Sequence, residues 1–233
     1  MPYFAIFDPR YLLIVGPTLL LAAWASMRVK STFTRYSRVG VSSGMTGAQA
    51  AAAVARAGGA QVSIERVDGF LSDHYDPRSK TLRLSPDVFD GRSVASIAVA
   101  AHEAGHAIQD VARYPALALR SRLVPVASIG SKLWIWIMMA GFLMVSRPLM
   151  LVGVTLLGAT VLFQLVTLPV EFDASNRAKQ VLATTGIVNT QAEAEGVSKV
   201  LSAAALTYVA GALTAVSTLL YYLLPMLTGR QED

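Results

Sequence analysis

Long apolar stretches alternate with polar stretches along this chain, and four of the apolar stretches are long enough to cross a lipid bilayer. They cover approximately residues 11–27, 124–145, 149–170 and 200–224. A helix needs roughly 20 mostly apolar residues to span the hydrocarbon layer. Only the segment 146–148 separates the second stretch from the third, so these two are predicted to form a tight helical hairpin. We therefore expect about four transmembrane helices in a single membrane-embedded domain over residues 1–233.

The polar segments contain signals for shorter helices. Thr46 is placed to cap a helix over residues 47–57, which would stop at the following glycine pair. Ser85 or Ser93 is placed to start a helix that runs over residues 94–113. These signals predict at least two helices in the region after the first apolar stretch.

Two further segments have the alternating pattern of half-buried strands. They cover residues 61–67 and 81–85, and the residues between them at 73–77 are rich in turn formers. Strands and short helices together predict a small α+β unit within residues 28–122. The expected fold class is a mainly α membrane protein that carries this small unit.

The composition supports a membrane location. Hydrophobic residues make up 54% of the chain and charged residues 15%, well below the quarter that is typical of soluble proteins. A chain of 233 residues cannot bury so much apolar surface inside itself, so the lipid bilayer is an expected partner. There are no cysteines, which excludes disulfides, thiolate zinc sites and a cysteine nucleophile.

The basic residues predict the orientation. Thirteen Lys or Arg residues lie within 28–122 and three more within 171–199, whereas the opposite side has Arg10, Arg147 and Arg230. Cytoplasmic loops are enriched in Lys and Arg, so we expect both segments in the cytoplasm. Both termini are then expected on the outer side of the cell (inner) membrane. The basic residues do not form a motif with aromatics, so no nucleic-acid partner is expected despite the net charge of +5.

The first apolar stretch has an alternative interpretation as a cleaved signal peptide. Residues 23–25 resemble a small-x-small cleavage site. Against this, Asp8 precedes the stretch without a basic cluster, and the basic residues follow it from Arg28 onward. The flanking charges favour a retained anchor.

The candidate chemistry lies in the predicted helix 94–113, in the sequence His102-Glu103-Ala104-Gly105-His106. Residues four apart share one face of a helix, so His102 and His106 are able to bind one zinc ion. Glu103 is then placed to take a proton from a water activated by the metal and to pass it to a leaving amine. The chain has only three histidines, and two are here in an apolar helix where unpaired polar groups are costly.

A catalytic zinc ion usually has a third protein ligand. No histidine follows the motif, so a carboxylate is expected, and Glu171 directly follows the third apolar stretch. The predicted hairpin returns the chain to the face that it left, which brings Glu171 toward the motif. Asp173 is the weaker alternative ligand.

Two more features are candidates for contact with a substrate. His74 is either a residue that orients substrate or stabilises the transition state, or a structural residue of its turn. The strand around Leu82 and Leu84 is a candidate edge strand that aligns an extended peptide by strand addition. Small residues such as Gly153 and Gly158 are able to pack helices within one chain or in a homo-oligomer.

Four segments carry a resemblance to a known family: Leu71-Ser72-Asp73-His74-Tyr75-Asp76-Pro77, Leu84-Ser85, Ala100-Ala101-His102-Glu103-Ala104-Gly105-His106-Ala107-Ile108-Gln109 and Leu168-Pro169-Val170-Glu171-Phe172-Asp173-Ala174-Ser175. Over nearly the whole chain the sequence resembles the YugP-type bacterial membrane zinc metallopeptidases. It is more distantly similar to the gluzincin membrane proteases of the HtpX and CAAX prenyl types.

The resemblance implies a zincin-like catalytic unit that cleaves a peptide or membrane-protein substrate, with a role in membrane protein quality control. It also implies His102, His106 and Glu171 as zinc ligands and Glu103 as the general base. The more distant relatives usually have an aspartate four residues after the glutamate ligand, where this chain has Ser175.

Two other functions remain open from the sequence. A site-two-type intramembrane protease would place the zinc helix in the bilayer, but Arg92 and Asp110 limit that helix to the lower end of a spanning length. A non-catalytic adaptor with a structural zinc ion would need a fourth protein ligand, for which His74 and Asp173 are candidates.

Overall fold

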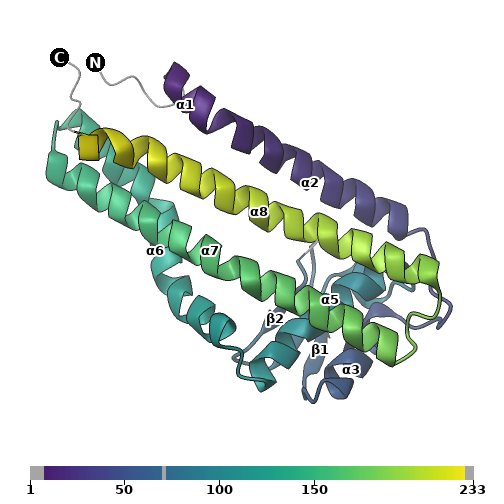
Figure 1. The fold of residues 1–233 in the computed structure, drawn as a ribbon. Helices are drawn as coiled ribbons and strands as arrows, with labels where there is room; N and C mark the ends of the chain where they lie inside the picture. The colour runs from purple at the N-terminus through teal and green to yellow at the C-terminus, as the bar shows by residue number, and fades with distance from the viewer. Residues whose placement is uncertain (1–7, 70–71, 229–233) are drawn as a thin grey trace. The chain divides into compact units, whose positions relative to one another are not determined.

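The computed structural model describes residues 8–69 and 72–228, and it is mainly helical with one small sheet (Figure 1). In chain order the elements are α1 (Pro9–Ile14), α2 (Gly16–Tyr36), α3 (Gly47–Ala57), β1 (Ser63–Arg66), β2 (His74–Asp76), β3 (Thr81–Leu84), α4 (Pro86–Phe89), α5 (Val94–Val111), α6 (Pro115–Leu143), α7 (Arg147–Thr184) and α8 (Gln191–Thr228).

The chain forms two compact units. The helical unit takes the described residues up to 25, together with 119–168 and those from 207 onward. The mixed unit takes residues 26–118 and 169–206. Leu71, Arg230 and the two chain ends, which entered the sequence predictions, lie outside the described residues.

Among the described residues, three helices are long and apolar enough to cross a membrane. They comprise Pro115–Leu143, Arg147–Thr184 and Gln191–Met226. They contain the third and fourth predicted stretches and all but the last two residues of the second, and these three stretches are therefore confirmed as candidate spans. The predicted hairpin is also confirmed: α6 ends at Leu143, α7 begins at Arg147, and the N–H of Ser146 donates to the carbonyl of Gly141 over 2.8 Å.

The first predicted stretch, 11–27, is not among these three helices. It is divided between α1 and α2, with Val15 between them. Pro17 has no N–H to donate into the preceding turn, which explains the interruption. Because α2 already contains Arg28 and Lys30 in its second half, its apolar part is short. A fourth span therefore stays a prediction.

Contacts within the helical unit tie the first stretch to the last helix. The hydroxyl of Tyr221 donates to Oδ2 of Asp8 over 2.6 Å, and the ring of Tyr11 packs edge-on against Tyr221 at 5.1 Å between centroids. In the hairpin, a Cβ at Gly153 would come within 3.1 Å of the backbone nitrogen of Met138, whereas one at Gly158 would meet nothing within 4 Å. Gly153 thus packs α7 against α6 of the same chain.

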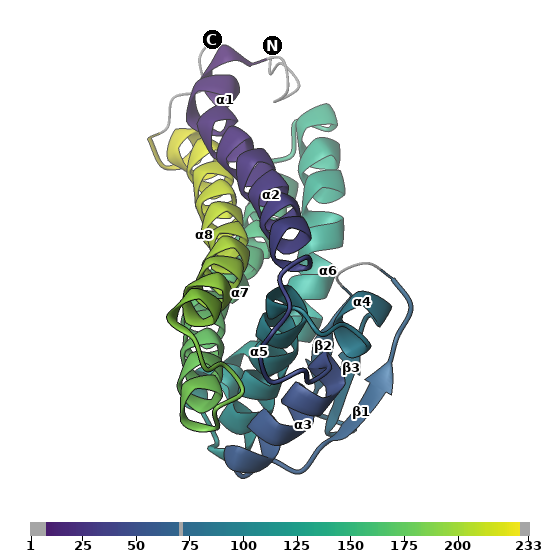
Figure 2. The ribbon, with the colours of Figure 1, turned by 90° about the vertical axis from the view of Figure 1, so that its right-hand side faces the viewer.

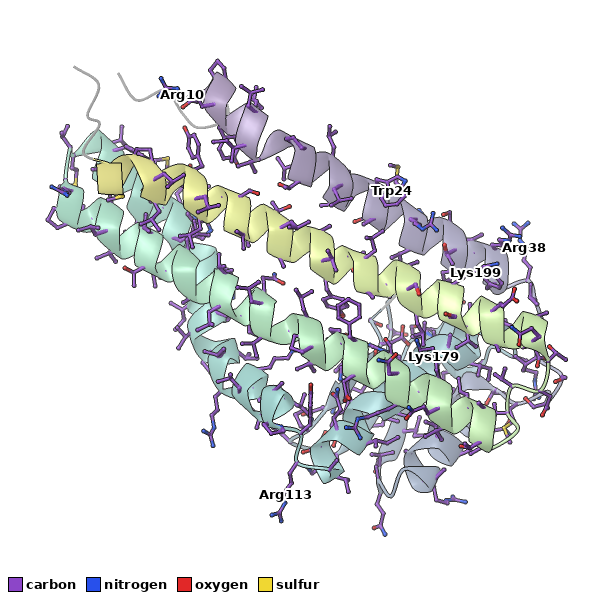
Figure 3. All side chains as sticks on the ribbon, in the orientation of Figure 1. Arg10, Trp24, Arg38, Arg113, Lys179 and Lys199 are labelled. Atoms are coloured by element: carbon purple, nitrogen blue, oxygen red, sulfur yellow. The ribbon has the colours of Figure 1, made fainter. Side chains whose placement is uncertain are left out.

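Basic residues are concentrated in the mixed unit. Arg38, Arg113, Lys179 and Lys199 belong to it, while Arg10 lies on α1 of the helical unit (Figure 3). Of the basic residues predicted to face the cytoplasm, only two fall in the helical unit, near the start of α6: Arg120 and Arg122.

The three strands of the mixed unit form a sheet in the order β1-β3-β2. β1 pairs with β3 in parallel and β2 pairs with β3 antiparallel. The segment 73–77, predicted as a turn, therefore contains β2. The prediction that Leu82 and Leu84 lie on an edge strand is wrong, because β3 is the central strand and both side chains are fully buried in the core.

The helices of the mixed unit begin at the residues that the sequence predicted. Thr46 and Gln49 form a reciprocal capping box on α3, with bonds of 3.2 and 2.9 Å. Both candidate serines begin a helix: Ser85 precedes the short α4, and Ser93 caps α5 by accepting from the N–H of Ser96 over 3.1 Å. The sequence predicted one helix that starts at either serine, whereas the structure has two, α4 and α5. The second of them ends at Val111, two residues before the predicted end.

α5 is the centre of the mixed unit. Fifteen of its 18 residues are buried, and it packs against α3 and the sheet (Figure 2). The hydroxyl of Tyr75 on β2 donates to Oδ2 of Asp110 near the end of α5 over 2.6 Å. This bond holds β2 against the helix that carries the candidate zinc motif.

Candidate metal centre

The three motif residues lie in the middle of α5. His102, Glu103 and His106 are each at least nine-tenths buried. The two imidazole rings stack edge to face with 4.8 Å between their centroids, as expected for residues one helical turn apart. Burial of two imidazoles and a carboxyl in an alanine-rich helix is costly unless they have polar partners.

α7 supplies the third group. Oε2 of Glu171 lies 3.1 Å from Nε2 of His102 and 3.5 Å from Nε2 of His106. Glu171 is buried, and one ligand atom from each of the three residues lies within 4.8 Å of the others. The structure thus brings together the three ligands that the sequence predicted.

Gly105 allows this close approach of α7. A Cβ at this position would lie 2.4 Å from the backbone oxygen of Ala174 and 3.0 Å from its carbonyl carbon. Real Cβ atoms do not come that close to backbone, so any other residue would push α7 away. The glycine of the motif therefore has a packing role, which the motif alone does not reveal.

Each imidazole is also bonded on its other nitrogen. Nδ1 of His102 lies 3.1 Å from Oγ of Ser175, and Nδ1 of His106 lies 3.0 Å from Oε1 of Gln109. Such bonds fix ring orientation in metal sites and leave Nε2 for the metal. Ser175, four residues after Glu171, thus contacts the ring of His102 directly.

Asp173 is not part of the group. Its Oδ2 accepts from Nε2 of Gln109 over 2.8 Å and from Nε of Arg177 over 2.6 Å. It therefore supports the site from outside, and Glu171 is the better-placed ligand. Sequence reasoning missed Gln109; its only signal was a polar side chain three residues after His106 in a buried helix.

Burial raises the pKa of Glu103 to about 7. The neighbouring imidazole of His102 opposes this increase, and the nearby carboxyls of Glu171 and Asp73 add to it. A carboxyl with a pKa near neutrality is suited to accept and release a proton at physiological pH. The carboxyl of Glu171, in contrast, is paired with both imidazoles.

His74 lies on β2 and its side chain is exposed. Its Nδ1 is 2.8 Å from the backbone oxygen of Ser72, and its imidazole opposes the increase in the pKa of Glu103. Its neighbour Asp73 accepts from the N–H of Ser85 over 2.7 Å, and burial raises the pKa of Asp73. His74 is outside the candidate ligand group but acts electrostatically on Glu103.

The donor set fits a zinc ion. Two imidazole nitrogens and one carboxylate oxygen are a usual ligand set of catalytic zinc. Zinc bonds of about 2.0–2.1 Å in tetrahedral geometry place neighbouring ligand atoms roughly 3.3 Å apart. The distances of 3.1 and 3.5 Å from Oε2 of Glu171 to the two Nε2 atoms are close to that value.

Comparison with known proteins agrees with this geometry. Residues 11–227 match the profile of a family described as "Putative neutral zinc metallopeptidase". The chain belongs to this family. This match includes α5 and α7. The four residues of the candidate centre, His102, Glu103, His106 and Glu171, therefore all lie within the matched region.

One curated relative is similar over nearly its whole length. The chain is 45% identical over 224 residues to the "Putative membrane protease YugP" of Bacillus subtilis (strain 168), which covers 96% of this chain and 99% of the relative. No solved structure gave a significant match. The resemblance inferred from the sequence motifs is therefore confirmed at the level of the family.

Proposed function

We propose that this chain is a zinc-dependent integral-membrane endopeptidase that hydrolyses peptide bonds at the cytoplasmic face of the cell membrane. The observation that carries the proposal is the buried group of His102, His106 and Glu171 with Glu103 beside it. Family membership and the three candidate spans support the same function.

In this proposal His102, His106 and Glu171 hold one zinc ion through Nε2, Nε2 and a carboxylate oxygen. When bound, zinc supplies a Lewis acid that polarises the scissile carbonyl and makes water more acidic. Glu103 accepts the proton of the attacking water and then donates it to the leaving amine. Its burial and its pKa near 7 suit both halves of that transfer.

The proposed location follows from the distribution of basic residues. We place the segments 28–122 and 171–199 in the cytoplasm and both termini outside the inner membrane. This orientation requires an even number of spans, so the stretch 11–27 is proposed as the fourth. The hydrogen bond that Tyr221 donates to Asp8 and the ring contact between Tyr11 and Tyr221 support its retention beside α8.

The proposed substrate is a peptide or an unfolded membrane-protein segment, and the proposed role is membrane protein quality control. His74 is proposed to contact this substrate, because it is exposed on β2 and acts electrostatically on Glu103. A His74→Gln variant should raise KM or lower kcat in peptide hydrolysis without any loss of bound zinc. Unchanged kinetics would assign His74 to its turn alone.

Two observations weigh against the other functions. Among the helices that the structure describes, α5 is not a candidate span, which opposes a site-two-type intramembrane protease. The candidate ligand group has three members in the described chain, whereas a closed structural zinc site needs four. A non-catalytic adaptor would also have no use for a buried Glu103 beside the metal.

The test compares wild type with Glu103→Gln, both purified in detergent. We expect equal zinc content, and hydrolysis of an unfolded membrane-protein substrate should fall by about 10²–10⁴-fold in the variant, the usual contribution of a general base. Glu195→Gln is a matched control, because Glu195 is exposed on α8. If wild type bound zinc but neither protein hydrolysed any substrate tested, the adaptor would be favoured.

A further inference from the structure

Gln109 is the most completely buried polar side chain next to the candidate centre. It is 0% exposed and lies on α5 three residues after His106. Both ends of its amide have close partners. Nε2 donates to the backbone oxygen of Val170 over 2.7 Å and to Oδ2 of Asp173 over 2.8 Å, and Oε1 faces Nδ1 of His106 at 3.0 Å.

These partners determine which way the amide points. A backbone carbonyl accepts and cannot donate, and an ionised carboxylate likewise only accepts. Both therefore require the NH2 group of Gln109. The reversed amide would place its oxygen against two other acceptors, so Oε1 must face His106.

The amide in turn determines the tautomer of His106. Because Oε1 is an acceptor, Nδ1 of His106 must carry the hydrogen. A neutral imidazole then has its lone pair on Nε2, the atom that lies 3.5 Å from Oε2 of Glu171. The metal-binding nitrogen is thus available before any ion arrives.

His102 is held differently. Its Nδ1 is 3.1 Å from Oγ of Ser175, and a hydroxyl is able to donate or to accept. This contact alone does not choose between the two tautomers, but Oε2 of Glu171, an acceptor 3.1 Å from Nε2 of His102, favours the hydrogen on Nε2 in the zinc-free chain. The two histidines are therefore expected to differ, although the motif presents them as equivalent.

Asp173, the partner of the Gln109 amide, is itself held in place by Arg177. Nε of Arg177 donates to Oδ2 of Asp173 over 2.6 Å, and the guanidinium of Arg177 lies over the ring of Tyr114 at 5.8 Å. Arg177 thus fixes the position of the Asp173 oxygen that accepts from Gln109. The chain of contacts from Tyr114 to His106 thus fixes one hydrogen position at the centre.

We propose that Gln109 is a positioning residue that holds His106 in the Nδ1–H tautomer, with Asp173 and Arg177 fixing the Gln109 amide. The inference rests on the proposed function only for the identity of the ion. The tautomer itself is a property of the zinc-free chain, so the two are tested separately.

The experiment uses the full chain in detergent micelles, labelled with 15N-histidine, stripped of metal and held at mildly alkaline pH. Two-bond 1H–15N correlations distinguish Nδ1–H from Nε2–H rings, and the three histidines are assigned with His74→Gln and Ser175→Ala. In wild type we expect His106 as the Nδ1–H tautomer. In Gln109→Met, which keeps the length but loses both hydrogen-bonding ends, we expect a mixture of tautomers.

Zinc affinity is the second readout. Gln109→Met should bind zinc about 10–100-fold more weakly, as is usual when a bond to a metal-ligating histidine is lost. Gln109→Glu keeps an acceptor for His106 but sets its second oxygen against two acceptors, the Val170 carbonyl and Asp173. Combined with Asp173→Asn, whose amide is able to donate to that oxygen, it should keep the Nδ1–H tautomer of His106, a rescue that a purely structural role does not predict. Ser175→Ala should leave the His106 tautomer unchanged.

The inference is overturned if wild-type His106 is an Nε2–H ring or a mixture, or if Gln109→Met has the wild-type tautomer and affinity. The wild-type spectrum alone determines the tautomer of His106, so this outcome is decided even if a variant fails to fold. If His106 is the Nδ1–H tautomer but wild type binds no zinc, the inference stands and the proposed function fails.

Discussion

Gly105→Ala is a single-methyl change that tests how α7 brings Glu171 to the histidines. The added Cβ would lie 2.4 Å from the backbone oxygen of Ala174, whereas ordinary contact begins at 3.4 Å. If the two helices respond as rigid bodies, α7 must move from α5 by about 1 Å. Zinc–ligand distances tolerate only about ±0.2 Å, so a movement of this size disrupts the set of three ligands.

Two opposite contributions set the change in stability. Replacement of glycine by alanine inside a helix is worth about 1 kcal/mol in favour of alanine. Overpacking of a well-packed contact costs about 1–3 kcal/mol. The variant should therefore range from no net change to a loss of about 2 kcal/mol, and it should fold. Its zinc affinity should fall by at least about tenfold, as expected for a disturbed ligand set.

Gly158→Ala is the matched control, because a Cβ at this α7 position meets nothing within 4 Å. It should be at least as stable as wild type and bind zinc normally. Thermal unfolding by circular dichroism gives the stability, and titration against a competing chelator gives the zinc affinity. A Gly105→Ala protein with wild-type zinc affinity and the stability of Gly158→Ala would refute the argument that this glycine sets the distance between the helices.

Three further outcomes follow from the contacts described above. Thr46→Ala removes the capping box of α3 and should lower the free energy of unfolding by about 1 kcal/mol, measured by chemical denaturation. Arg83, with the N–H of Arg78 and the hydroxyl of Ser79, holds the pKa of Asp76 well below its ordinary value. The wild type should therefore be more stable than Asp76→Asn at neutral pH. The difference should begin to shrink as the pH falls below about 4, the ordinary pKa of an aspartate, and it should disappear only as the pH passes the much lower folded-state pKa; a difference that does not change with pH would contradict this. Removal of zinc by a chelator should lower the thermal midpoint, and zinc at about 100 times its Kd should restore about 2.7 kcal/mol.

Local signals predicted much of the fold. The caps at Thr46 and Ser93 fixed the starts of α3 and α5, because a cap satisfies N–H groups that belong to its own helix. The histidine pair was equally local, since the helical repeat alone places His102 beside His106. Glu171 was predicted from topology, because a hairpin returns the chain to the face that it left.

Long-range pairing accounts for most of what the sequence did not predict. An alternating pattern identifies a half-buried strand but does not say which strands flank it, and so Leu84 was wrongly assigned to an edge. β2 is only three residues long and is held by pairing with β3 and by the bond from Tyr75 to Asp110. Gln109 and Ser175 acquire their roles only when α7 lies against α5.

The zinc content of the purified protein tests the central claim most directly. Elemental analysis would compare wild type with His106→Ala, Glu171→Ala and the exposed control Glu195→Gln, all folded in detergent. The account predicts close to one zinc per chain in wild type and in the control, and a marked loss in the two ligand variants. A wild type without zinc after the metal is supplied, or a Glu171→Ala variant that binds zinc as fully as wild type, would contradict it.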